Sequence, residues 1–511
     1  MLHAAAKQAG SLERDARHLA SVLDRRRYPL LVLLTVVYVF GAVMHARSTP
    51  FWYDEVITMI AAGAPDAATA YRAAQQTDTS PPLPHLLIHF SMQWWGKNEI
   101  GARIPAIVGF WIFCLCLYRF TRRRAGIYYA LAALLIPITT DAYTYSVWAR
   151  AYGMEFAFCG LALIAWQAAA DGSRRIVALP ALAASLVGAT LCHYYAILLW
   201  VPLAGGEAFR CYRARKVDWG IWAALAAGSA ALVWRAAAIA GMGKATAHTW
   251  APPYPGQVLE FWETGLPHAL PFAALLLALV ALSIVIARDE PDAPLRPAVS
   301  VPDHELVAGV LFLAIPVIAV AGALFVTHMF TPRYVVFALA GIAFLAPMVA
   351  AHLLQRRALF GFLLAVVMLA SLAFVTMDIP PPRNPFLEEP ILAKALETEP
   401  VVISDGQLFL QLWQYAPDSL KSRLLFLADT DAAIEYMGFD TIDSGILVLR
   451  PWAPLKALEY KSFFAPGREF LLYRNLLRPE WLLAKVIKDG GSARLQEFNY
   501  RRELLRVRFR P

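Results

Sequence analysis

The sequence predicts a polytopic α-helical membrane protein with about eleven transmembrane helices and a C-terminal extracytoplasmic α/β domain. Of its 511 residues, 59% are hydrophobic and only 16% are charged, whereas soluble domains have about 45–50% apolar and about 25% charged residues. Arginines stand in short clusters between long apolar runs, as they do in membrane loops. These features exclude soluble, disordered, fibrous and disulfide-stapled classes. They also explain the formal net charge of +8 without a nucleic-acid partner.

Residues 1–27 are predicted to form a cytoplasmic segment. The first apolar run follows an acidic and basic stretch and ends in HARST, without an A-x-A cleavage site. We therefore expect a membrane span there and not a cleaved signal. Leu12, Leu19, Val22 and Leu23 recur at roughly helical spacing. This spacing predicts a helix that lies on the cytoplasmic face of the membrane.

Eleven apolar runs approach the length of about 20 residues that a spanning helix needs. They are 28–45, 104–118, 126–140, 154–170, 176–192, 194–209, 220–240, 269–287, 306–326, 334–353 and 358–376. A twelfth run, 81–95, is short and begins with two prolines. We place the transmembrane domain at 28–376.

The basic residues indicate that 81–95 does not cross. With a cytoplasmic N-terminus and no crossing there, most of the arginines between the spans lie on the cytoplasmic side. If 81–95 crossed, TRRR at 121–124 would move outside and this bias would be lost. We therefore interpret 81–95 as a juxtamembrane or re-entrant helix. Residues 46–103 then form one long extracytoplasmic loop, and loops of this length are usually functional.

A separate domain is predicted after the last span, at 377–511. It begins with the proline-rich linker DIPPPRNPF, and then strand-like and helix-like pieces alternate, which is typical of an α/β domain. Strands are expected at 401–405, 423–429, 445–450 and 469–474, and helices at 407–416, 432–438 and 479–488. Eleven crossings place this domain on the same side as residues 46–103.

The sequence contains no familiar cofactor motif. No glycine-rich nucleotide loop occurs, and only Asp405-Gly406 follows the first strand of the α/β domain. The five cysteines lie inside or beside apolar runs and form no CxxC pair, so we interpret them as buried thiols. They are Cys114, Cys116, Cys159, Cys192 and Cys211. No cofactor is expected.

Five polar clusters are expected on the extracytoplasmic face, where the membrane boundary makes retained polar groups informative. The first is Asp54 and Glu55, which could cap a helix or supply a general base near the membrane surface. The second contains Asp78, His85 and His89. The two histidines are spaced i, i+4 and would share a helix face, so they could bind a metal, but no third ligand is evident.

The other three clusters combine aromatic and basic side chains. The third consists of Asp141, Tyr143, Tyr145, Arg150 and Tyr152. Its alternative interpretation is an aromatic belt with a snorkelling arginine. The fourth is His193, in a very short turn, where an interfacial role is the alternative.

Arg333 and Tyr334 form the fifth cluster, and Arg235 lies near the outer end of its span. Arg235 could snorkel or bind an anion. The planar guanidinium suits phosphate oxygens. Together, a candidate base and several arginines at the depth of a lipid headgroup suit a substrate made of a phosphate on a lipid tail.

In the order of these motifs the chain resembles the GT-C membrane glycosyltransferases, in particular glycosyltransferase family 39. This family includes the protein O-mannosyltransferases and the lipid A aminoarabinose transferase. The resemblance covers about residues 1–376. Its motifs here are Asp54-Glu55, Asp78-Thr79-Ser80-Pro81-Pro82-Leu83, Gly96 to Glu99 and Arg103-Ile104-Pro105, Ser146 to Tyr152, His193-Tyr194, and Pro332-Arg333-Tyr334. The sequence departs from the family at Ser80, where relatives often have histidine, and at Pro84-His85, which replaces a common Tyr-Tyr.

The resemblance implies inverting transfer of a sugar from a polyprenyl-phosphate donor to a hydroxyl of a lipid, glycan or protein acceptor. It implies that Asp54 is the base and that Glu55 supports it or contacts the acceptor. Arg150, Arg333, Tyr334 and Arg235 would hold the phosphate. Further candidate site residues are Asp78, His85, Arg103, Tyr152 and His193. The expected location is the inner membrane, in contact with its lipids.

Two other functions are compatible with many membrane spans. A lipid or glycolipid transporter or flippase would show internal repeats or helices broken at the bilayer midplane. The sequence shows no repeat, and its polar clusters gather at one face. The third alternative is a membrane scaffold in which the α/β domain carries the function.

Overall fold

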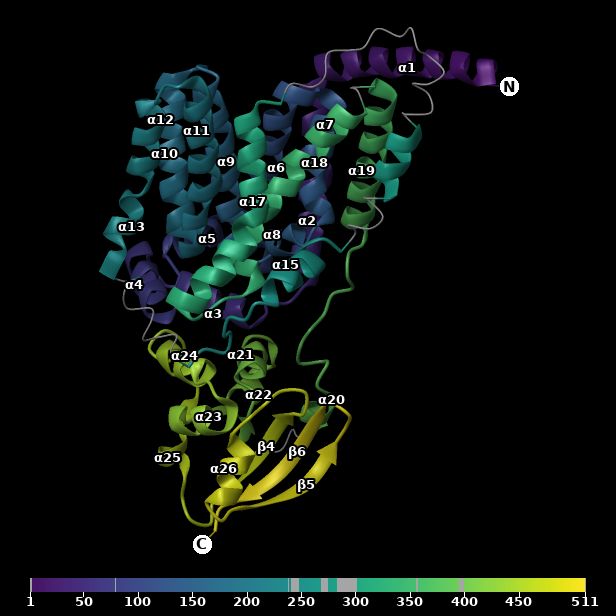
Figure 1. Ribbon diagram of the computed structural model, residues 1–511. Helices are drawn as coiled ribbons and strands as arrows, with labels where there is room; N and C mark the ends of the chain where they lie inside the picture. The colour runs from purple at the N-terminus through teal and green to yellow at the C-terminus, as the bar shows by residue number, and fades with distance from the viewer. Residues whose placement is uncertain are drawn as a thin grey trace.

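A helical bundle with a smaller α/β domain at one end makes up the chain (Figure 1). The structure is a computed structural model that describes residues 2–78, 80–237, 239, 248–267, 274–282, 301–354, 357–394 and 399–510. In Figure 1 the N-terminal helix lies across one end of the bundle, and the C-terminal domain lies beyond the opposite end. The predicted class, a polytopic helical membrane protein with a C-terminal α/β domain, is confirmed.

Among the described residues, seven helices are long and apolar enough to span a membrane. They are α2 (Arg27–Ser48), α6 (Glu99–Ala125), α9 (Tyr152–Ala170), α10 (Arg175–Cys192), α17 (Asp303–Gly322) continued by η3 (Ala323–Thr327), η4 (Pro332–Leu339) continued by α18 (Ala340–Leu353), and α19 (Ala358–Met377). Each covers one of the predicted runs. The chain is therefore a multi-pass membrane protein.

The four remaining predicted runs contain shorter helices. They are α7 (Ile127–Leu135) with η1 (Ile136–Thr139), η2 (Tyr194–Leu199) with α11 (Trp200–Ala214), α12 (Trp219–Gly228) with α13 (Ala230–Trp234), and a helical stretch at 274–282. Parts of 220–240 and 269–287 lie outside the described residues. The count of eleven crossings stays a prediction.

Helix α1 (Leu2–Arg25) lies across the end of the bundle farthest from the C-terminal domain (Figure 1). The carboxylate of Glu13 accepts hydrogen bonds from the backbone N–H groups of Ala358 and Leu359, at distances of 3.0 and 2.9 Å. These N–H groups belong to the first turn of α19 and have no hydrogen-bond partner within that helix. Leu12 and Leu19 remain exposed, as expected for an amphipathic helix on a membrane face.

The loop after α2 folds into α3 (Tyr53–Ala62), α4 (Ala67–Thr77) and α5 (Leu83–Trp95). Helix α5 has 13 residues, too few to cross about 30 Å of hydrocarbon at 1.5 Å per residue. It packs against α3, α4 and α6, and in Figure 1 α3 and α4 lie at the end of the bundle that faces the C-terminal domain. The interpretation of 81–95 as a juxtamembrane helix agrees with this placement.

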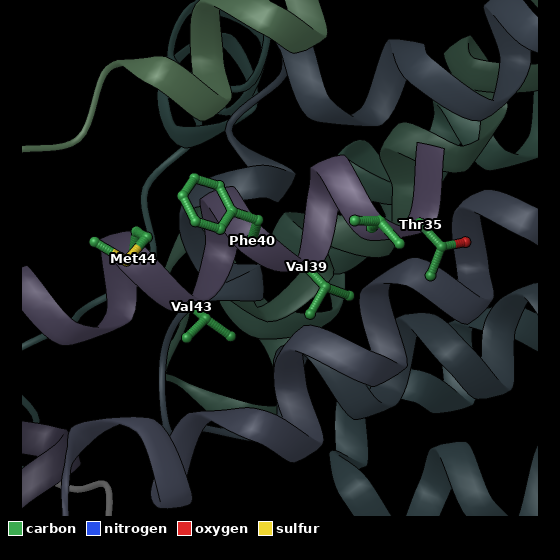
Figure 2. A pocket seen from close by; sticks show the side chains of 6 residues that line it. Thr35, Val39, Phe40, Val43 and Met44 are labelled. Carbon is green, nitrogen blue, oxygen red and sulfur yellow. The ribbon is translucent and has the colours of Figure 1, made fainter. Parts of the chain in front are cut away.

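The outer face of α2 is apolar and open. Thr35, Val36, Val39, Phe40, Val43 and Met44 line a shallow groove along it (Figure 2). The side chains of Val36 and Phe40 are 60% and 62% exposed. Exposed apolar side chains on a spanning helix face lipid tails, so this groove belongs to the lipid-contacting surface.

The C-terminal domain is built on one sheet with the strand order β3-β2-β1-β4-β6-β5. The strands are β1 (Val401–Ile403), β2 (Leu424–Ala428), β3 (Ala457–Glu459), β4 (Glu469–Asn475), β5 (Ser492–Phe498) and β6 (Arg502–Arg508). Strands β1, β2, β3 and β4 run parallel to one another, and β6 is antiparallel to β4 and to β5. The helices are α20 (Pro390–Lys394), α21 (Gly406–Tyr415), α22 (Asp418–Lys421), α23 (Thr430–Met437), α24 (Thr441–Leu449), α25 (Tyr460–Phe463) and α26 (Leu482–Lys488).

One predicted strand is wrong. Residues 445–449 belong to α24 and Arg450 is its C-cap, so this stretch is not part of the sheet. Short continuous apolar runs do not distinguish a buried strand from a buried helix. Here Ile446 and Leu449 are buried while Val448 is 41% exposed, which is the i, i+3 pattern of a helix with one face on a core. Strands β3, β5 and β6 were not predicted from the sequence.

The cysteines are free thiols, and four of the five are buried. Cys211 differs from the prediction because it is only half-buried. It lies near the end of α11, where its Sγ contacts the carboxylate of Glu207 at 3.3 Å.

Candidate functional site

The chain turns sharply after α2 and places Asp54 in the first turn of α3. Trp52 is the N-cap of that helix, and the side chain of Glu55 reaches back to accept a hydrogen bond from the Trp52 N–H at 3.2 Å. This is the capping-box arrangement, which satisfies a free donor at a helix start. Acidic side chains are also favoured there by the helix dipole.

Glu55 and Arg103 form a closed, buried ion pair. Arg103 Nε and Nη2 donate to the two carboxylate oxygens of Glu55 at 2.8 and 2.7 Å, and both side chains are 1% exposed. The backbone N–H of Ala149 donates to the same carboxylate at 2.7 Å. The remaining Arg103 donors bind the carbonyl oxygens of Ala46, Thr49 and Pro50. The pair thus ties the segment that precedes α3 to α6.

Asp54 faces a different partner. Its Oδ2 accepts a hydrogen bond from Arg333 Nη2 at 3.0 Å, and the two side chains are 18% and 14% exposed. The Arg333 guanidinium lies over the rings of Trp52 and Trp250, 5.1 and 5.5 Å from their centroids. Its Nε is buried and has no hydrogen-bond partner among the described residues. This arginine therefore keeps a donor for a further acceptor.

Arg150 lies beside this pair and is bound to Asp78. Its Nη1 donates to Asp78 Oδ2 at 2.7 Å, to Thr58 Oγ1 at 3.0 Å and to the Asp54 carbonyl oxygen at 3.5 Å. Burial alone would raise the pKa of Asp78, but the positive charge of Arg150 and the hydrogen bond from the Ser80 N–H hold that pKa well below its usual value. Asp78 is thus a fixed carboxylate that orients Arg150.

His85 and His193 contribute neutral rings to the same region. Burial lowers the pKa of His85 to about 4 and that of His193 to about 3, so both are uncharged at neutral pH. His85 Nε2 lies 3.6 Å from Asp78 Oδ2. His193 packs against the rings of Tyr334 and Tyr152, with centroids 5.0 and 5.9 Å apart.

A small polar cavity lies among these groups. Its lining residues are Thr58, Asp78, Ser80, Pro84, His85, Arg150, Ala151, Tyr152 and His193. Both ring nitrogens of His85 are buried and have no hydrogen-bond partner within the described chain. Buried polar groups of this kind are usually satisfied by water or a ligand.

His89 does not share a site with His85. Its Nδ1 lies 2.8 Å from the carbonyl oxygen of Ala62, so the ring joins α5 to the end of α3. Among the residues that the structure describes, no three His, Cys, Asp or Glu side chains gather closely enough to hold a metal ion.

Arg235 stands apart from the cluster. Its Nε donates to the hydroxyl of Tyr194 at 3.1 Å, and its guanidinium lies over the Trp234 ring. In the described part of the chain it has no recorded contact with Asp54, Arg150 or Arg333. The structure brings together the other predicted residues from six separate stretches of sequence.

Sequence reasoning missed Trp52, Trp250, Thr58 and Glu155. Trp52 is adjacent to the acidic pair, so its position could have been noticed. Glu155 lies in α9, is fully buried, and both carboxylate oxygens lack a hydrogen-bond partner in the described structure. Glu155 could have been identified from the sequence, because a lone acidic residue within an apolar span is usually functional.

Comparison with known proteins relates the fold to solved structures. No protein-family model and no curated protein sequence matches the chain. A crystal structure of ArnT from Cupriavidus metallidurans in the apo state has a TM-score of 0.56 at 12% identity, covering 94% of this chain and 98% of that one. A crystal structure of the same protein bound to undecaprenyl phosphate has a TM-score of 0.52 at 14% identity, covering 94% and 97%.

These similarities define the class of fold. The chain has the GT-C fold of membrane glycosyltransferases over nearly its whole length. The particular structures that it is similar to are those of ArnT, a lipid A aminoarabinose transferase. The fold expectation from the sequence is therefore confirmed.

Proposed function

We propose that this protein is an inverting glycosyltransferase that transfers a sugar from a polyprenyl-phosphate donor to an acceptor hydroxyl on the extracytoplasmic face of the membrane. The observation that carries the proposal is the Asp54–Arg333 pair, with Nη2 and Oδ2 3.0 Å apart. It combines a carboxylate that can accept a proton with a guanidinium that can hold phosphate. Arg150 adds a second cation beside Asp54, because its Nη1 donates to the Asp54 backbone carbonyl oxygen at 3.5 Å.

The pair suits a direct displacement. When donor phosphate approaches, Arg333 exchanges its hydrogen bond to Asp54 for one to a phosphate oxygen, which frees the carboxylate. The acceptor hydroxyl then attacks the anomeric carbon while Asp54 takes its proton. The bond from the anomeric carbon to the phosphate oxygen breaks, and the polyprenyl phosphate leaves with the electron pair. No acid catalyst is needed, because the leaving group is an anion that Arg333 and Arg150 stabilise.

Two further facts support this class of donor. The cluster lies at the end of the spanning helices, which is the depth of a lipid headgroup, and aromatic side chains surround it as they do at membrane interfaces. The solved ArnT structure with the same fold is bound to undecaprenyl phosphate. By this proposal the side chains of Tyr334, Tyr152 and His193 line one side of the donor site. Arg235 would contact only the edge of the phosphate group. The arginine distribution supports a cytoplasmic N-terminus, and we place the protein in the inner (plasma) membrane.

Release of polyprenyl phosphate tests the proposal. Purified protein in detergent or nanodiscs is incubated with a panel of polyprenyl-phosphate sugars, with and without envelope extracts as acceptor, and free polyprenyl phosphate is quantified. We expect acceptor-dependent release that disappears in Asp54→Asn. Movement of the intact donor across vesicles, without release of polyprenyl phosphate from any donor, would contradict the proposal and favour a transporter.

A further inference from the structure

The segment that precedes the cap of α3 is held from two sides. Arg103 binds three carbonyl oxygens of the segment 46–50 from the membrane domain. From the other side, the C-terminal domain binds the next residue, Phe51. The Phe51 N–H donates to the hydroxyl oxygen of Tyr415 at 2.7 Å, and Gln411 Nε2 donates to the Phe51 carbonyl oxygen at 3.2 Å. Both backbone polar groups of Phe51 are therefore bound by α21.

Tyr415 also joins α21 to α6. Its hydroxyl donates to Glu99 Oε1 at 2.6 Å, while the same oxygen accepts from Phe51. A hydroxyl with one donor and one acceptor partner has a fixed rotor, and its bond to a carboxylate is stronger than a neutral one. Three elements thus meet at this oxygen: the loop before α3, the first turn of α6, and the end of α21.

The apolar contacts follow the same arrangement. Phe51, Tyr53 and Val56 are buried in one core together with Leu408 and Leu412 of α21 and with Ile446 and Leu449 of α24. A Cβ added at Gly445 would lie 3.6 Å from the Tyr53 hydroxyl, so α24 also lies against α3. Figure 1 shows α21 and α24 at the face of the C-terminal domain that meets the bundle. The C-terminal domain therefore contributes most of the apolar side chains in the core beneath α3.

We propose that α21 of the C-terminal domain positions Asp54, with Tyr415 and Gln411 as positioning residues for the reaction that the proposed function assigns to it. Asp54 lies three residues beyond Phe51, in the first turn of a helix whose cap starts at Trp52. A shift of the Phe51 backbone moves the start of that helix, and with it the Asp54 carboxylate relative to Arg333. Misplacement of a reacting group by about 1 Å can reduce the rate by about 10²-fold.

The main variant is Tyr415→Phe in the full-length protein. It keeps the ring and removes the oxygen that contacts Phe51 and Glu99. Gln411→Leu is the second variant and removes the other bond to Phe51. The matched control is Tyr460→Phe, because the Tyr460 hydroxyl also donates to a carboxylate, Asp489 Oδ2 at 2.9 Å, within the same domain but away from α3.

Two measurements are made on each variant. The first is hydrogen–deuterium exchange of the peptide that contains Trp52 to Val56, which requires no activity. The second is steady-state transfer with a polyprenyl-phosphate sugar, together with donor binding. For Tyr415→Phe we expect exchange in this peptide to become about tenfold faster, as for one lost buried hydrogen bond, and kcat to fall at least about tenfold with donor affinity unchanged. Tyr460→Phe should change neither.

The readouts separate this inference from the proposed function. Unchanged exchange at Trp52 to Val56 in both Tyr415→Phe and Gln411→Leu overturns the positioning role, whatever the activity. Faster exchange with unchanged kcat also overturns it, because α3 would then move without consequence for the reaction. If the wild-type protein transfers no sugar, the proposed function fails, and faster exchange would still establish that α21 holds α3.

Discussion

Asp54 and Glu55 are adjacent in the sequence, but the structure gives them different surroundings. Glu55 is enclosed and every acceptor position faces Arg103 or a backbone N–H. Asp54 keeps partial exposure, and its carboxylate forms an ion pair with Arg333. A carboxylate that is fully bound inside the protein cannot receive a proton from substrate, whereas one with an exchangeable partner can. The geometry therefore favours Asp54 as the base and Glu55 as its support.

We predict that Asp54→Asn folds, retains donor binding and loses sugar transfer. The amide keeps the size of the side chain but cannot accept the proton, and general base catalysis is typically worth about 10²–10⁴-fold. Turnover and donor affinity are measured separately. Glu55→Gln is the comparison, since it weakens a buried pair with Arg103 and should lower the thermal midpoint of unfolding, which Asp54→Asn should not. Transfer by Asp54→Asn within a few-fold of wild type would remove Asp54 as the base.

Arg333→Lys is predicted to lose most of its activity although the charge remains. The guanidinium uses Nη2 for Asp54 and keeps Nε for another acceptor, and it lies over the rings of both Trp52 and Trp250. An ammonium is a compact point charge without this fork. Arg333→Lys and Arg333→Ala are compared for donor affinity and for kcat. Full activity of the lysine variant would show that Arg333 acts only as a charge, and full activity of both would leave it as an interfacial anchor.

At the scale of elements, the short helices of the 46–103 loop bring the polar groups together. Helix α3 carries Asp54 and Thr58, the start of α5 carries His85, and the turn before α9 carries Arg150. Asp66 caps α4 by accepting from the Thr69 N–H at 2.8 Å, and His89 joins α5 to α3. These local contacts explain why the loop is ordered, and why α5 can bury a histidine beside Asp78.

The buried histidine of α5 predicts a pH dependence of stability. Burial lowers the pKa of His85 from 6.5 to about 4. Between these values the unfolded chain binds a proton that the folded chain does not, so the free energy of unfolding falls as the pH is lowered from about 6.5 towards 4. Above about 6.5 His85 is neutral in both states and has no effect.

Thermal midpoints measured from pH 7.5 to pH 4.5 check this prediction. The slope of the wild-type midpoint below about pH 6.5 should become smaller in His85→Gln, which cannot titrate. His193 has the same sign of shift, so a part of the slope should remain in the single variant. An equal slope in His85→Gln would show that His85 is not buried as a neutral ring.

At the scale of the whole molecule, the two ends of the bundle differ in charge and in structure. One end carries α1 and the arginine-rich connections, where Arg124 pairs with Glu305 and Asp171, and Arg210 pairs with Glu207 and Asp218. The other end carries the candidate site and the C-terminal domain (Figure 1). The separation matches the positive-inside pattern, which predicts that the end with α1 is cytoplasmic.

Single cysteines test this orientation in a background with Cys211→Ser. Gln76 on α4 and Ser462 in the C-terminal domain are exposed, as is Lys216 in the turn between α11 and α12. We expect an impermeant thiol reagent applied outside intact spheroplasts to label Gln76→Cys and Ser462→Cys, and to label Lys216→Cys only after permeabilisation. The opposite pattern would invert the topology, and labelling of all three without permeabilisation would contradict the separation of the two ends.

The sequence by itself determined the fold class and the approximate position of most helices, and it predicts the side of the membrane on which the polar residues gather. Composition and the spacing of arginines are properties of the chain that need no contacts, because they follow from the cost of placing charge in hydrocarbon. The first strands of the α/β domain were also predictable, since alternation of short apolar runs with polar turns is a local signal.

Only the tertiary structure decided which of the polar residues act together. Asp54 and Arg333 are separated by 279 positions, and Glu55 differs from Asp54 only in the partners that folding brings to it. The helix at 445–449 followed from its packing on β2 and α21, which a short apolar run does not encode. The contribution of the C-terminal domain to α3 likewise depends on Tyr415 meeting Phe51 across 364 positions. Such pairings arise because burial and hydrogen bonding are satisfied by the folded chain as a whole and not by neighbouring residues.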